Sequence, residues 1–194
     1  MDIYRLFIAA ELPAQIKGAL VAMQDRLRQG NPPVKWVAPQ AMHLTLRFLG
    51  DTAIEQLPRL SAALKSALAD RAAIRLRLNA AGVFPNERRP SVVWAGVGGA
   101  IAALAGAQAD IEATVAGLDF VPEAKAFRAH LTLGRMHREA RPEQHQQLSA
   151  VVRMLPAPEP LEWTVERIVL FRSELRNDGP IYTEIVDYRL QAVD

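Results

Sequence analysis

The 194-residue chain contains no cysteine. Disulfide bonds, thiolate nucleophiles and cysteine-ligated zinc sites are therefore excluded, and a reducing compartment is indicated. Long hydrophobic runs are also missing. The first 13 residues hold too short an apolar stretch for a signal peptide or a membrane span, and the Ala-rich segment 101–118 is interrupted by two acidic residues. We therefore expect a cytoplasmic protein without membrane association.

A strong charge of one sign is absent as well, because the formal net charge is only +2. This value is not typical of a protein that coats nucleic acid, although it permits a local basic cleft. Hydrophobic residues make up 50% of the chain, enough for a substantial core in one compact domain of two lobes. No disordered linker and no low-complexity segment divides the chain, so a single domain over residues 1–194 is expected.

Hydrophobic periodicity predicts a similar order of elements in each half of the chain. Each half should contain a helix, a histidine-bearing strand, a second helix and two further strands. Helices are expected at 13–29, 54–69, 100–116 and 142–154. Strands are expected at 3–10, 43–49, 74–83, 91–97, 130–134, 162–171 and 181–190, the last two joined by a turn at 177–180.

Two nearly identical strings stand at matching places in this order. His43-Leu44-Thr45-Leu46 and His130-Leu131-Thr132-Leu133 are separated by 87 residues, close to half the chain. A duplicated α+β unit folded about a pseudo-two-fold axis would bring the strings face to face. The expected fold is therefore bilobal, with two antiparallel sheets, outer helices and an active site in the cleft between the lobes.

The side chains of a strand alternate between its two faces. The first string then places His43, Thr45 and Arg47 on one face, and the second places His130 and Thr132 together. The leucines lie opposite, against the outer helices, so each His/Thr face should line a polar cleft.

These residue types suit phosphodiester cleavage without a metal. Two imidazoles with ordinary pKa values near 6.5 can take one proton and deliver another at neutral pH, and each threonine hydroxyl can donate to a phosphate oxygen. A single histidine on a strand is more often a structural residue than a catalyst. Two matched strings are much harder to explain by chance, and they favour catalysis.

Other features have a structural and a functional interpretation. Arg47 and Arg135 could contact RNA phosphates, or could lie in solvent or in a structural ion pair. Arg135 falls nominally on the leucine face, so its contact requires a bulge or the strand end. The loop 87–89 could touch RNA or could be a solvated turn. His137 and His145 are expected in solvent, since neither has a partner at metal-ligand spacing.

Two further patterns favour structure over function. The glycine-rich stretch 96–99 lacks the spacing of a nucleotide-binding loop and indicates a tight turn between a strand and a helix. Trp36, Trp94 and Trp163 fit strand patterns and are expected in the core, although one aromatic ring could stack on a base.

With its two His-x-Thr strings, the sequence resembles the two-histidine (2H) phosphoesterases. The most similar branch is that of the bacterial and archaeal RNA 2′,3′-cyclic phosphodiesterases, also called LigT-like 2′-5′ RNA ligases. The resemblance covers nearly the whole chain and rests on Phe127 and on segments 5–9, 11–13, 36–37, 43–50, 82–86, 89–90, 93–97, 130–135, 173–175 and 179–182. One departure is Ala129, where members of the family often carry proline before the second histidine.

The resemblance implies a metal-independent enzyme without cofactors that opens RNA 2′,3′-cyclic phosphate ends to 2′-phosphates. His43 would protonate the leaving 3′ oxygen and His130 would deprotonate the attacking water. Thr45 and Thr132 would hold the phosphoryl oxygens. The reverse reaction would join RNA through a 2′-5′ linkage. The expected partners are RNA ends, with tRNA fragments among the candidates, and the expected state is a monomer.

Two alternatives stay open at this point. The same site could act on another small cyclic phosphate, such as a nucleoside cyclic monophosphate or an ADP-ribose cyclic phosphate. The chain could also be a catalytically silent module that binds RNA ends. Intact histidine and threonine residues in both strings argue against silence, and a turnover assay separates the possibilities.

Overall fold

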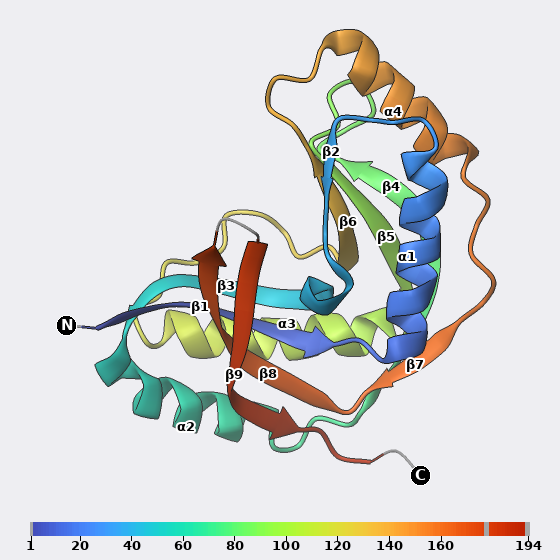
Figure 1. Ribbon diagram of the computed structural model, residues 1–194. Helices are drawn as coiled ribbons and strands as arrows, with labels where there is room; N and C mark the ends of the chain where they lie inside the picture. Colours follow the sequence, from blue (N-terminus) through green and yellow to red (C-terminus); the bar gives the residue numbers. More distant parts are fainter. Residues whose placement is uncertain (1, 177–178, 193–194) are drawn as a thin grey trace.

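The computed structural model describes residues 2–176 and 179–192 and contains two antiparallel sheets with helices on their outer faces (Figure 1). The first sheet has the strand order β3-β1-β8-β9, with strands His43–Ala53, Ile3–Glu11, Arg167–Arg176 and Gly179–Arg189. The second sheet has the order β2-β6-β5-β4-β7, with strands Val34–Trp36, His130–Met136, Val92–Gly99, Ile74–Phe84 and Glu162–Val165. The expected α+β architecture with two antiparallel sheets is confirmed.

The four expected helices are present as α1 (Ala14–Arg28), α2 (Leu57–Leu68), α3 (Ile101–Ala116) and α4 (Pro142–Met154). Each buries a stripe of residues at helical spacing; in α1 this stripe is Ile16, Leu20, Met23 and Leu27. Pro13 directly precedes α1, where a missing backbone N–H costs no helical hydrogen bond. Within residues 2–176 and 179–192, no helix combines the length and the apolar character needed to cross a membrane.

The helices are exchanged between the sheets. Helix α1 follows β1 of the first sheet, yet its buried Gln24 donates a hydrogen bond of 2.8 Å to the carbonyl oxygen of Leu133 in the second sheet. Helix α3 follows β5 of the second sheet, yet it packs against α2 and β3 (Figure 1). The two halves of the chain therefore interlock across the two sheets.

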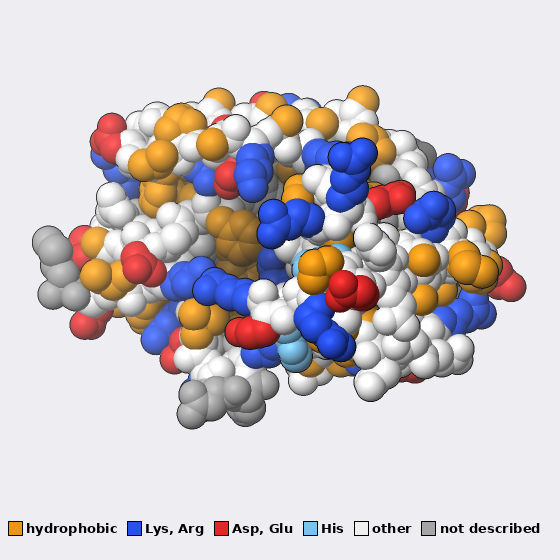
Figure 2. Space-filling view, turned by 90° about the horizontal axis from the view of Figure 1, so that it is seen from above, with side chains coloured by type: hydrophobic (Ala, Val, Ile, Leu, Met, Phe, Trp, Pro, Cys, Tyr) orange, Lys and Arg blue, Asp and Glu red, His pale blue; other side chains and the backbone are white. Residues whose placement is uncertain are grey.

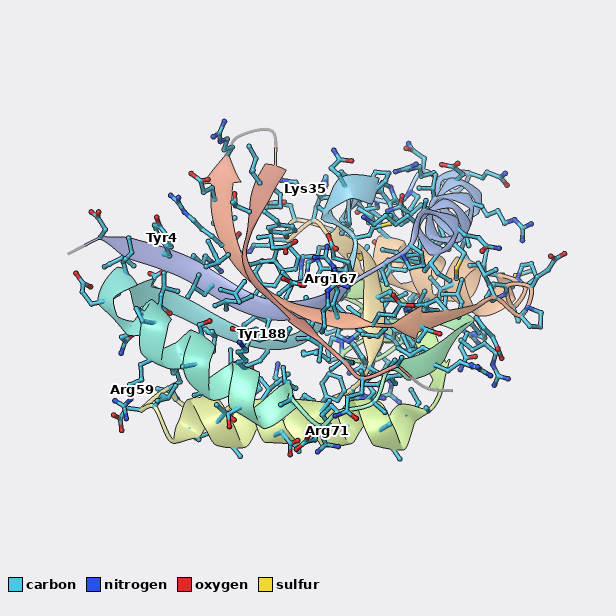
Figure 3. The ribbon with its side chains drawn as sticks, turned by 90° about the horizontal axis from the view of Figure 1, so that it is seen from below. Tyr4, Lys35, Arg59, Arg71, Arg167 and Tyr188 are labelled. Carbon is cyan, nitrogen blue, oxygen red and sulfur yellow. The ribbon has the colours of Figure 1, made fainter. Side chains whose placement is uncertain are left out.

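Side chains between the layers fix this arrangement. Tyr188 of β9 lies against α2, with its hydroxyl 3.5 Å from that of Ser61 (Figure 3). Arg71 lies beside α3 and donates to a carboxylate oxygen of Asp110 at 2.6 Å (Figure 3). The first contact ties α2 to the first sheet, and the second ties α3 to the segment that follows α2.

Some details of the strands differ from the sequence-based expectation. The expected strand 162–171 is two strands, because the chain leaves the second sheet after Val165 and enters the first sheet at Arg167. The short strand β2, which pairs with β6, was not expected at all. Of the expected turn 177–180, residues 177 and 178 lie outside the described residues, and Gly179 and Pro180 belong to β9.

Candidate active site

Both histidine strings contain a β-bulge at the same position. In the first sheet Ala9 is opposite Thr45 and Ile8 is opposite Arg47, which leaves Leu46 as an extra residue. In the second sheet Trp94 is opposite Thr132 and Val93 is opposite Gly134, which leaves Leu133 as the extra residue. A bulge shifts the alternation of side chains by one residue. The leucines before each shift stay buried on the helix side, as expected (Leu44, Leu46, Leu131 and Leu133).

The bulge overturns the prediction for Arg47. This side chain was expected beside His43 and Thr45, but it is only 6% exposed and points into the helix layer. Its Nε atom lies 2.7 Å from a carboxylate oxygen of Glu112 in α3, and it donates to the carbonyl oxygen of Val121. Arg47 therefore forms a buried structural ion pair with Glu112 and does not face the phosphate.

Phe48, the residue after Arg47, lies on the face that carries His43, where Arg47 was expected. Phe48, expected among the leucines, is 52% exposed, and its ring centroid lies 6.0 Å from that of Phe7. In the second string the equivalent residue is Arg135, which the bulge turns onto the same face as His130. The sequence analysis required a bulge for Arg135 to contact a phosphate, and the structure contains this bulge.

The two histidines are held in the same way. Nδ1 of His43 lies 2.8 Å from the carbonyl oxygen of Ala41, and Nδ1 of His130 lies 2.7 Å from that of Arg128. A carbonyl oxygen can only accept, so Nδ1 carries the hydrogen in both rings. Nε2 is then the atom left for chemistry, as an acceptor in the neutral ring and a donor in the charged one.

Aromatic rings form the walls around both imidazoles. The ring of His43 lies 4.8 Å from Phe7 and 5.2 Å from Tyr182, as centroid distances. The ring of His130 lies 5.0 Å from Phe84, edge to face. The sequence analysis did not single out these three aromatic residues as part of the site. For Phe7, the alternation of side chains along β1 could have indicated that its ring faces the same side as Ala9.

Burial lowers the pKa of both histidines below the ordinary 6.5, against a smaller raising effect of each backbone hydrogen bond. Lys17 and His130 also lower the pKa of His43, and Arg135 and Arg128 lower that of His130. The strands β3 and β6 contact each other, and the effect of His130 on the pKa of His43 is consistent with this proximity.

We call the surface that carries His43, Thr45, His130 and Thr132 the histidine cleft. Both threonines are half-buried on the histidine face of their strands. Seen from above, the molecule is hollowed between the sheets, with hydrophobic side chains at the floor and Lys and Arg side chains around the edge (Figure 2). The cleft thus combines two titratable rings, two hydroxyls and a positive rim.

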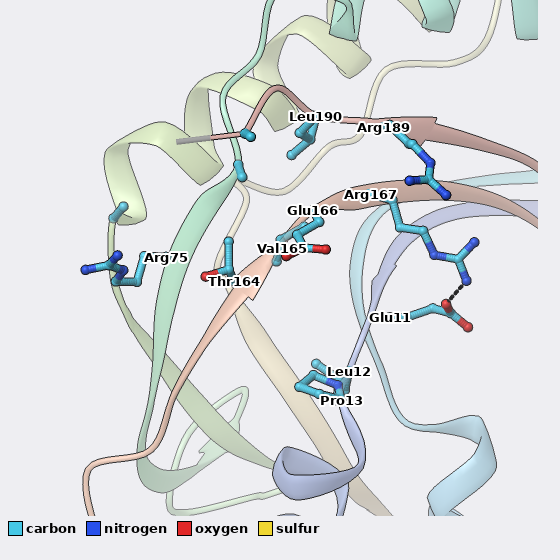
Figure 4. Close-up of a pocket in the computed structure, with 13 residues that line it drawn as sticks. Glu11, Leu12, Pro13, Arg75, Thr164, Val165, Glu166, Arg167, Arg189 and Leu190 are labelled. Atoms are coloured by element: carbon cyan, nitrogen blue, oxygen red, sulfur yellow. Dashed lines mark hydrogen bonds and ion pairs between the residues drawn. The ribbon is translucent and has the colours of Figure 1, made fainter. Parts of the chain in front are cut away.

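A second hollow of about 1120 Å³ lies at the joint between the sheets (Figure 4). Its lining contains no residue of the histidine cleft. The charge of Arg167 within it is already paired with Glu11 and Glu184. The histidine cleft therefore remains the candidate active site, because both histidines and both threonines of the paired strings lie there.

The structure also describes the surroundings of the remaining sequence features. His137 is exposed, as expected, but His145 is half-buried and its Nδ1 lies 3.0 Å from the carbonyl oxygen of Pro90, so its expected solvation was wrong. The stretch 96–99, expected as a tight turn, is instead the end of β5, and only Gly99, with φ +89°, lies where the strand ends before α3. A Cβ on Gly99 would lie 2.7 Å from the backbone oxygen of Arg75. Trp163 is buried, while Trp36 and Trp94 are half-buried. Residues 87–89 are exposed.

Replacing Arg47 with alanine should destabilise the protein by about 2–4 kcal/mol, because Glu112 would keep a partly buried charge without its partner. Urea unfolding of both variants measures this cost. Arg153→Ala is the matched control, since its ion pair with Glu87 is well exposed and should contribute at most about 1 kcal/mol. Equal losses in the two variants would contradict the structural role of Arg47.

Comparison with known proteins consistently finds phosphoesterases. The family model described as LigT-like phosphoesterase matches residues 10–94 and again residues 98–182. The RNA 2′,3′-cyclic phosphodiesterase of Methanothermobacter thermautotrophicus is 31% identical, over 96% of this chain and 98% of that protein. The protein of the same name from Thermus thermophilus is 34% identical, over 96% and 90%.

Solved structures agree with the sequence relatives. The crystal structure of a Thermus thermophilus protein is 33% identical with a TM-score of 0.77, covering 97% of this chain and 98% of that one. E. coli LigT in complex with 3′-AMP is 25% identical with a TM-score of 0.78, covering 97% and 99%.

Proposed function

The chain belongs to the LigT-like phosphoesterases of the 2H superfamily, and from this premise we propose that it hydrolyses RNA 2′,3′-cyclic phosphate ends to 2′-phosphates. The observation that carries the proposal is the matched pair of histidines, each with Nδ1 held by a backbone carbonyl and each followed by the same bulge. The names of the relatives supply the substrate class. We propose that residues 1–194 act as one domain, since both sheets contribute to one cleft.

The proposed mechanism uses the two Nε2 atoms. His130 takes a proton from a water molecule as the water oxygen attacks phosphorus. The bond from phosphorus to the 3′ oxygen breaks, and His43 gives its proton to that oxygen. Positioned acids and bases of this kind typically contribute about 10²–10⁴-fold each. The assignment of acid and base follows the family resemblance, because the two sites are nearly symmetric.

The threonines have a supporting role in this proposal. Each hydroxyl lies one pleat along the strand from its histidine and can donate to a non-bridging phosphate oxygen. Such donors stabilise the charge that builds up on the phosphoryl group. A 5′-hydroxyl RNA in place of water would run the same chemistry in reverse and form a 2′-5′ linkage.

The experiment that tests the proposal is a reaction of the purified protein with an RNA oligonucleotide that ends in a 2′,3′-cyclic phosphate, in a strong chelator. We expect a 2′-phosphate product and a rate that a divalent cation does not raise, because imidazoles perform both proton transfers. Loss of activity in chelator with recovery on adding a divalent ion would contradict the two-imidazole mechanism. Binding without turnover would favour the silent module.

The pH dependence should reflect the burial of both rings. The base must be neutral and the acid charged, so kcat/KM should follow a bell whose two limbs belong to the coupled pair. Since burial lowers both pKa values, its maximum should lie on the acid side of 6.5. A bound phosphate stabilises both imidazolium forms, so the limbs of kcat should lie at higher pH. A kcat/KM maximum well on the alkaline side of neutrality would count against this arrangement.

A further inference from the structure

Three cations at the edge of the histidine cleft have no role in the proton transfers. We infer that Arg5, Lys35 and Arg135 form a second phosphate site, which holds the internal phosphodiester next to the terminal cyclic phosphate. The inference rests on the proposed function and narrows its substrate class: an RNA strand should be preferred over a free cyclic mononucleotide.

The second sheet contributes two of these cations side by side. Lys35 of β2 is directly opposite Arg135 of β6, and both side chains are exposed. Their neighbours Val34 and Met136 are buried on the helix side, so Lys35 and Arg135 share the face that carries His130. Like charges directly opposite each other destabilise a strand pair. An anion held between them would remove this repulsion.

The first sheet contributes the third cation. Arg5 precedes Phe7 and Ala9 on the cleft face of β1 and is exposed. The ring of Tyr182 packs 4.8 Å from that of Phe7, as a centroid distance. Burial raises the pKa of the Tyr182 hydroxyl, and Arg135 and Arg5 both act against that rise. Arg5 and Arg135 thus approach Tyr182 from different sheets, across the mouth of the cleft.

The three cations are available to a ligand. Asp51 is opposite Arg5 on β3, yet it does not approach within ion-pair distance. Across residues 2–176 and 179–192, Arg5, Lys35 and Arg135 make no ion pair with any carboxylate. Surface arginines elsewhere do find partners, as Arg28 does with Asp25.

The position of this site relative to the histidines fits one strand of RNA. The ring of Tyr182 lies 5.2 Å from that of His43, so a phosphate beside its hydroxyl is a near neighbour of the reacting one. Phe48 lies on the same face and is 52% exposed, which offers a ring for base stacking. Cations beside an exposed ring are the combination that single-stranded nucleic acid binds.

The test compares kcat/KM for a dinucleotide ending in a 2′,3′-cyclic phosphate with kcat/KM for the matching nucleoside 2′,3′-cyclic monophosphate. The native chain should prefer the dinucleotide by about 10-fold or more, the worth of one good charge-assisted contact. Arg5→Gln and Lys35→Gln should each remove most of this preference. Raising the salt concentration should reduce it as well, because phosphate contacts are salt-dependent. Lys65→Gln should keep the preference, because Lys65 belongs to α2, a helix on the outer face of the first sheet (Figure 1).

The outcomes separate the two levels of the proposal. Equal kcat/KM for both substrates in the native chain, or an equal loss on both substrates in Arg5→Gln and Lys35→Gln, would overturn the second phosphate site and leave the proposed function intact. Turnover of neither substrate would refute the proposed function. In that case the second phosphate site is tested by equilibrium binding of a labelled RNA pentanucleotide with a 3′-terminal phosphate. Arg5→Gln and Lys35→Gln should weaken this binding, and Lys65→Gln should leave it unchanged.

Discussion

His43→Ala and His130→Ala are each expected to lower kcat by about 10²–10⁴-fold, the usual contribution of a positioned acid or base. Each variant removes one of the two Nε2 atoms that handle protons, and alanine offers no substitute. Single-turnover kinetics on a cyclic-phosphate oligonucleotide measure the chemical step directly. His137→Ala is the matched control, because His137 is exposed and should be dispensable.

The two histidines should also behave as a unit. Both take part in one proton transfer sequence, so the double variant should lose less than the product of the two single losses. Each single variant should lose one limb of the pH bell. Strictly multiplicative losses, or a folded His43→Ala or His130→Ala protein with near-normal turnover, would contradict the acid and base roles and favour a binding module.

Thr45→Val and Thr132→Val are expected to lower kcat by at most about 10²–10³-fold, the range for one donor to a developing negative charge. Valine keeps the branched shape on the strand and removes only the hydroxyl, so folding should change little. Thr45→Ser and Thr132→Ser keep the donor and should retain most of the activity. A loss confined to KM would indicate ground-state binding alone, and equal losses in the serine and valine variants would indicate packing.

The pattern of elements could be predicted because it depends on local properties. The apolar stripe of α1 and the paired strings of β3 and β6 are visible in the sequence and confirmed by the structure. Periodicity also placed the leucines of both strings in the core. The split of 162–171 into β7 and β8 was missed, since a continuous apolar run does not record which sheet each part joins.

The surroundings of the predicted catalytic residues depended on long-range pairing. A bulge arises from the register against a neighbouring strand. Alternation alone therefore could not predict on which face the side chains of Arg47, Phe48 and Arg135 lie. The half-burial of His145 depends on Pro90, 55 residues earlier in the chain. Gln24 of α1 bonds the backbone of Leu133 only because the helices are exchanged between the sheets.

The sequence by itself therefore determined the fold class and the residue types of the candidate chemistry, because these follow from short-range periodicity and from two repeated strings. The family was indicated by the resemblance of motifs along nearly the whole chain. The tertiary structure decided which cations face the cleft and which lie in the helix layer. The physical reason is that the face of a strand residue beyond a bulge is set by hydrogen bonds to another strand. For Arg47 and Arg135 those partners, β1 and β5, lie about 40 residues earlier in the chain.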